Sequence, residues 1–120
     1  MDDWHPFVHS SFVEIDADAL SKVLHGLKRI QEHMTDQLQL ITLVFVKSGI
    51  IVKKGIEGSE AIGPHVIFGL HRRDNVPPEL IFDLWGFEVA YALNPEFRKM
   101  PRKVVLSAND EHIVATFESR

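Results

Sequence analysis

The sequence predicts an α+β protein: a single domain with a mainly antiparallel sheet and two helices, in the order (β)-α-β-β-β-α-β-β. Its 120 residues have room for one core, and the shares of hydrophobic (45%) and charged (25%) residues are those of an ordinary globular domain. Apolar residues follow a helical spacing in one segment, and a second apolar segment begins with a proline suited to the start of a helix. The other apolar segments are short and joined by turn residues, which favours hairpins over strand–helix alternation.

The amino-terminal third is expected to form a short edge strand and then a helix. Residues 12–15 are apolar enough for the strand, and Asp16 has the side chain of a helix N-cap. From there to about Met34, apolar side chains recur on one stripe of a helical wheel and charged ones on the opposite face. The apolar stripe consists of Leu20, Val23, Leu27, Ile30 and Met34. The pattern predicts a helix that lies on a core.

Three strands are expected next. Residues 40–46 are apolar except for Thr42 and do not alternate, which is typical of a central strand covered on both faces. Ser48-Gly49 suits a hairpin turn into residues 50–52, so we expect these two strands to be antiparallel neighbours. A loop over residues 55–63 then leads to a strand over 64–72.

A second helix is expected from Pro78 to Leu93, because proline suits the first helical position. Large apolar side chains cover nearly its whole circumference, which one sheet cannot bury, and an exposed apolar surface marks a protein interface. Glu88 falls inside this apolar arc, where a carboxylate needs a partner. We therefore predict a partner or dimer interface made of Phe82, Trp85, Glu88 and Tyr91. The alternative is that residues 4–12 cover the helix.

A closing hairpin is expected from residues 104–107 and 113–118, on either side of a turn over 108–111. The predicted order of elements is similar to that of class I secretion chaperones, which dimerise through a middle helix. This similarity is one of topology, and the carboxyl-terminal helix of that family is not expected here.

Seven histidines raise the question of a metal or acid–base site. His5 and His9 are four residues apart, but Pro6 separates them and no Glu follows His5 as in the H-E-x-x-H zinc motif, so no metal site is predicted. His65 and His71 would share one face of the strand over 64–72. Gly69 would leave a shallow depression between them, and three charged residues follow: Arg72, Arg73 and Asp74. This face would suit anion binding or acid–base chemistry; the alternative is an ordinary solvent face.

Other chemistry has little support in the sequence. There is no cysteine, no nucleophile motif and no phosphate-binding glycine loop, so we expect no disulfide and no cofactor. A basic cluster follows Phe97 and consists of Arg98, Lys99, Arg102 and Lys103. The formal charge of −4 opposes nucleic-acid binding, so a solvated basic loop is favoured over a nucleic-acid site.

These observations favour a non-enzymatic protein-binding module that masks or neutralises a partner, as do immunity proteins, antitoxins, anti-defence inhibitors and secretion chaperones. A homodimer formed through the predicted second helix is the other possible use of its apolar surface. The expected partner is basic, and its predicted contacts are Glu14, Asp16, Asp18, Glu57 and Glu60. The alternative function is a small-molecule-binding protein or small enzyme that uses the face of His65 and His71. The acidic amino end and the absence of a long apolar run predict a cytoplasmic protein without membrane contact.

Overall fold

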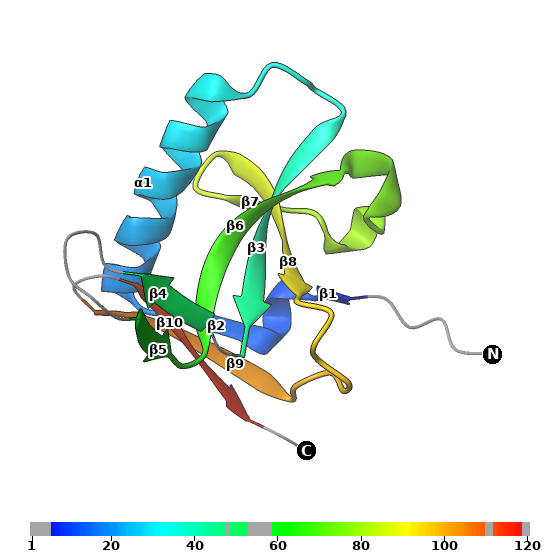
Figure 1. Ribbon diagram of the computed structural model, residues 1–120. Coiled ribbons are helices and arrows are strands. Elements are labelled where there is room, and N and C mark those ends of the chain that lie inside the picture. The colour runs from blue at the N-terminus through cyan, green and yellow to red at the C-terminus, as the bar shows by residue number, and fades with distance from the viewer. Residues whose placement is uncertain (1–5, 48, 53–58, 110–111, 119–120) are drawn as a thin grey trace.

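A curled mixed sheet with one α-helix forms the protein in the computed structural model, which describes residues 6–47, 49–52, 59–109 and 112–118 (Figure 1). The strands lie in the order β1-β8-β3-β6-β10-β9-β2, and β7 pairs with β8. Their bounds are β1 Phe7–Val8, β2 Val13–Ile15, β3 Gln39–Val46, β6 His65–Arg72, β7 Phe82–Leu84, β8 Phe87–Leu93, β9 Lys103–Ala108 and β10 Ile113–Glu118. The α+β class and the single compact domain are as predicted.

The sheet curls because its two edge strands are close neighbours in the sequence. β1 and β2 lie at opposite ends of the seven-strand order, so a flat sheet would separate them by ~29 Å. Only residues 9–12, which include the short 3₁₀ helix η1 (Ser10–Phe12), connect them. The five Cα steps from Val8 to Val13 reach at most ~18 Å. The sheet must therefore bend to bring its edges together.

The helix α1 (Ala17–His33) lies along one side of the sheet (Figure 1) and agrees with the prediction. The carboxylate of Asp16 accepts a hydrogen bond of 2.8 Å from the backbone N–H of Ala19, as an N-cap does. Ala19, Val23 and Leu27 are fully buried against the sheet. Amphipathic spacing and a cap therefore sufficed to locate this helix.

Two interior strands of the sheet, β3 and β8, are covered on both faces. Inside the curl, their side chains join α1 in one apolar cluster that includes Leu43, Phe45 and Tyr91. On the outer face, Leu40, Ala90 and Ala92 pack with side chains of the segment over 76–81, which contains the 3₁₀ helix η3 (Pro78–Leu80). The central position predicted for residues 40–46 is confirmed.

The predicted second helix is wrong, because residues 78–93 form η3, β7 and β8. In β8, Val89, Tyr91 and Leu93 point into the main cluster, while Ala90 and Ala92 point to the outer one. A strand buried on both faces carries apolar residues at every position, and on a helical wheel these fill the whole circumference. The similarity to the element order of secretion chaperones depended on this helix and is lost with it.

The predicted hairpin between residues 40–46 and 50–52 is also wrong. β4 (Gly49–Val52) pairs with β5 (Ser59–Ile62) in a separate two-stranded sheet, and β5 occupies part of the expected loop. β3 instead pairs along its whole length with the antiparallel β6 and, on its other side, with the parallel β8. The eight-residue β6 satisfies many more backbone groups of β3 than a four-residue strand would. The closing hairpin of β9 and β10 is confirmed.

Candidate functional site

The hairpin of β7 and β8 carries the most exposed large apolar side chain of the described residues. Leu84 pairs with Phe87, which leaves Trp85 and Gly86 as a two-residue loop. Their φ angles are 51° and 93°, the signs of a type I′ turn. The carboxylate of Asp83 accepts a hydrogen bond of 3.2 Å from the Gly86 N–H. The turn is therefore defined by its own backbone and by Asp83.

Trp85 itself is poorly suited to this turn. A residue other than glycine in the left-handed region costs on the order of 1–2 kcal/mol, and asparagine or aspartate is usual at this position. The indole is 72% exposed, so packing does not compensate this cost. Neither the turn nor the core explains a tryptophan here.

The base of the hairpin is anchored in the core. The ring of Phe82 lies 4.9 Å from that of Tyr91, which in turn stacks on Phe45 at 5.4 Å between centroids. Tyr91 is only 3% exposed, and this burial raises the pKa of its hydroxyl to about 12. Of the residues predicted to form an interface, Tyr91 is thus a core residue and Phe82 is half-buried against it.

Glu88 does not lie in an apolar arc, contrary to the expectation for the second helix. It is exposed on β8 opposite Asp83, and it pairs with Arg73 at 2.8 Å. Both side chains are well exposed, so the ion pair contributes little stability. The ion pair neutralises Glu88, so that Asp83 is the unpaired carboxylate of this hairpin within the described residues.

The two histidines of β6 share a face, as predicted, but each is engaged by a different neighbour. The Nδ1 atom of His65 lies 2.8 Å from the carbonyl oxygen of Gly63. The Nδ1 atom of His71 lies 2.8 Å from the hydroxyl of Thr42, and its ring meets Phe7 edge-on. Burial lowers the pKa of His71. The six residue steps from His65 to His71 separate them by ~20 Å along the strand, so they do not converge on one ligand.

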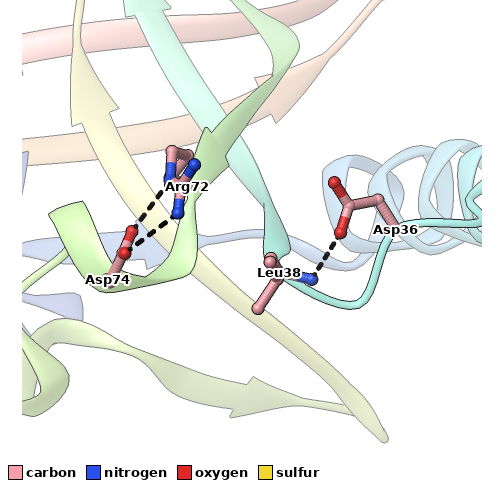
Figure 2. A network of polar contacts seen from close by, with 4 residues as sticks. All are labelled: Asp36, Leu38, Arg72 and Asp74. Atoms are coloured by element: carbon pink, nitrogen blue, oxygen red, sulfur yellow. Dashed lines mark hydrogen bonds and ion pairs between the residues drawn. The ribbon is translucent and has the colours of Figure 1, made fainter.

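The expected depression at Gly69 is filled by neighbouring side chains. A Cβ atom there would lie 3.0 Å from Val44 and 3.1 Å from Thr42. At the end of β6, Arg72 pairs with Asp74 through its Nε atom at 3.2 Å (Figure 2). The hydrogen bond to Arg72 lowers the pKa of Asp74. The residues expected to form a ligand face, from His65 to Asp74, therefore contact neighbouring parts of the chain.

The acidic residues predicted to contact a partner do not form one surface: some make contacts within the fold, one is exposed, and two lie wholly or partly outside the description. Glu14 pairs with Lys103 at 2.9 Å, which raises the pKa of that lysine, and Asp16 caps α1. Asp18 is exposed in the first turn of α1. Glu57 lies outside the described residues, and Glu60 is in β5 with a side chain outside the description. The cap made by Asp16 agrees with the sequence prediction, whereas the pairing of Glu14 with Lys103 depends on the tertiary structure.

No protein family, curated protein or solved structure matches the chain. Within the described residues, no group of three or more His, Cys, Asp or Glu side chains is placed to hold a metal ion. None of the described helices is long and apolar enough to cross a membrane.

Sequence reasoning selected Trp85 as part of an apolar helix, whereas its exposure comes from a tight turn. The signal for this turn was Leu-Trp-Gly-Phe, with glycine between two apolar runs. Sequence reasoning also missed two residues distant from the basic cluster, Lys47 and Phe117, which the fold brings beside it.

Proposed function

We propose that the protein is a non-enzymatic binding module that masks a surface of another protein, with Trp85 as its anchor. The observation that carries this proposal is a tryptophan that is 72% exposed at a turn position that disfavours it. Such a residue is retained at a cost in stability, and strained positions of this kind concentrate at functional sites. Tryptophan is also among the residues that dominate binding energy in protein interfaces.

The hairpin is organised for binding before a partner arrives. Its turn is held by Asp83, and its base by the contact between Phe82 and Tyr91. A preformed turn loses little backbone conformational entropy on association. The partner would offer an apolar pocket that takes an indole ring.

A basic partner fits the charge of the chain. The formal net charge is −4, and Asp83 next to the anchor forms no ion pair within the described residues. Inhibitors of the immunity-protein, antitoxin or anti-defence kind act by such masking. A secretion-chaperone function has no support in this fold, because the similarity depended on a middle helix where the chain forms η3, β7 and β8.

The test is the substitution Trp85→Asn, which removes the indole and places a residue suited to the turn. We expect the melting temperature to stay constant or rise while capture of the partner from native cells is lost. Leu38→Ser is the matched control, since Leu38 is 62% exposed outside the hairpin. A protein held by the wild type and by Leu38→Ser but released by Trp85→Asn is the expected partner.

Two results would contradict the proposal. Capture of the same proteins by Trp85→Asn and by the wild type would show that the indole is not the anchor. A wild-type dimer in light scattering that Trp85→Asn converts to a monomer would assign the hairpin to self-association instead.

A further inference from the structure

A pocket of about 650 Å³ lies where β3 and β10 end, away from the residues used in the proposed function. The loop over 94–102, which follows β8, folds against these strand ends and forms one wall. The lining residues are Lys47, Phe97, Arg98, Lys99, Met100, Pro101, Phe117 and Glu118. A volume in this range is typical of pockets that enclose a small organic molecule.

The loop is held in place at both ends, so the pocket exists without a ligand. The backbone N–H of Asn94 donates to the carbonyl of Phe45 at 2.9 Å, and the N–H of Lys47 donates to the carboxylate of Glu96 at 2.5 Å. At the other end, the N–H of Arg102 donates to the carbonyl of Glu118 at 2.9 Å. These bonds join the loop to both β3 and β10.

The apolar wall is aromatic. Phe97 is buried and meets Phe117 edge-on, with 5.1 Å between the ring centroids. The ring of Phe117 also contacts that of Phe45 in the core, with 6.0 Å between the centroids. Met100 lies beside them at the pocket lining. Such a wall suits a flat ring.

The polar side of the pocket is positively charged, although the chain as a whole is negative. Lys47 lies over the ring of Phe97 at 5.0 Å, and Arg98 and Lys99 are exposed at the rim. None of these three cations forms an ion pair within the described part of the chain, whereas Arg72, Arg73 and Lys103 all do. Three neighbouring cations without a counter-ion suit a doubly charged anion such as a phosphate monoester better than a single carboxylate.

From this arrangement we infer that the pocket binds a nucleoside 5′-monophosphate. The phosphate lies against Arg98, Lys99 and Lys47, and the base lies against the wall of Phe97, Phe117 and Met100. The carboxylate of Glu118 accepts a hydrogen bond from a sugar hydroxyl or an exocyclic amine. The free nucleotide is the expected ligand, because the space is a pocket and not an extended basic groove.

The test is isothermal titration calorimetry of the full chain with AMP, ribose 5-phosphate, adenosine and an oligo(A) RNA of ten nucleotides. We expect AMP to bind, and each of the two fragments to bind at least tenfold more weakly. The double variant Arg98→Gln/Lys99→Gln should weaken AMP binding at least tenfold. The control Lys28→Gln/Arg29→Gln makes the same charge change on the exposed face of α1 and should leave it unchanged.

A second variant, Phe117→Leu, tests the aromatic wall. It should weaken AMP but leave the weak binding of ribose 5-phosphate as it was, and circular dichroism should show a folded chain. The inference is overturned if AMP fails to bind at millimolar concentration, or if both double variants bind it equally. Oligo(A) that binds more than tenfold tighter than AMP would overturn the assignment to a free nucleotide and identify a site for single-stranded RNA.

Discussion

Tyr91 is the only tyrosine of the chain, so its ionisation can be followed without interference from another phenol. Burial raises its pKa to about 12 in the folded state, against about 10 when unfolded. The folded state therefore holds this proton more tightly, and the stability falls as the pH rises from 10 to 12, by about 3 kcal/mol over the two units.

Absorbance titration at 295 nm should show tyrosinate appearing near pH 12 in the native protein and near pH 10 in urea. Loss of unfolding free energy over the same interval, measured by denaturant titration, should accompany it. A native midpoint near pH 10 would mean that the hydroxyl reaches water and that Tyr91 does not pack tightly against Phe45 and Phe82.

His71 responds to pH in the opposite direction. Burial lowers its pKa below the ordinary value of 6.5, so the unfolded chain takes up the proton first as the pH falls. Stability supported by neutral His71 is present above pH 6.5 and is lost as the pH falls through the folded pKa. We expect the unfolding free energy of the wild type to decrease more between pH 7.5 and 5 than that of His71→Gln. Equal decreases would show that the other histidines and carboxylates account for the effect.

At the scale of elements, the contact between α1 and β6 depends on a glycine in the middle of the helix. A Cβ atom on Gly26 would lie 2.4 Å from the Cζ atom of Phe68, too close for any real contact. Glycine costs about 1 kcal/mol relative to alanine within a helix, but overpacking costs about 1–3 kcal/mol. We therefore expect Gly26→Ala to destabilise the protein by about 1 kcal/mol, despite the better helix former.

A double-mutant cycle with Phe68→Leu separates the two effects. In the Phe68→Leu background, Gly26→Ala should be neutral or stabilising, since the ring that blocks the Cβ atom is gone. Urea unfolding of the four proteins measures the coupling. Additive effects would mean that the ring of Phe68 turns aside at no cost.

The whole molecule depends on the short connection between the two edges of its sheet. Deletion of Ser10 and Ser11 removes most of η1 from the connection between β1 and β2, and we expect the shortened connection to detach β1 from the sheet. Detachment of β1 would expose Phe7 and Val8, which are 5% and 0% exposed, at a cost of several kcal/mol. Insertion of four Gly or Ser residues doubles the loop and should cost only about 0.6 kcal/mol.

Hydrogen exchange at Leu93 reports on this detachment, because its N–H donates to the carbonyl of Pro6 at 2.6 Å. We expect fast exchange at Leu93 in the deletion variant and native protection in the insertion variant. Native protection in both would show that the sheet is held in its curl without the connection.

The features that could be predicted from the sequence are those formed by residues near one another in the chain. The helix after Asp16 was found because its cap and its apolar stripe are local. The hairpin of β9 and β10 was found because a short polar turn separates two apolar runs. The basic cluster at Arg98 and Lys99 could also be recognised as a run of charges, but its role could not.

The tertiary structure alone decided the rest. Apolar residues at every position are compatible with a buried helix or with a strand covered on both faces, and only the cluster on each side of β8 distinguishes them. The partners of β3 come from distant segments, and turn chemistry does not determine such pairing. The pocket likewise joins Lys47, Phe97 and Phe117 from three parts of the chain. The sequence by itself therefore determined the helix after Asp16, the closing hairpin and the α+β class, whereas long-range strand pairing decided which surfaces and pockets exist.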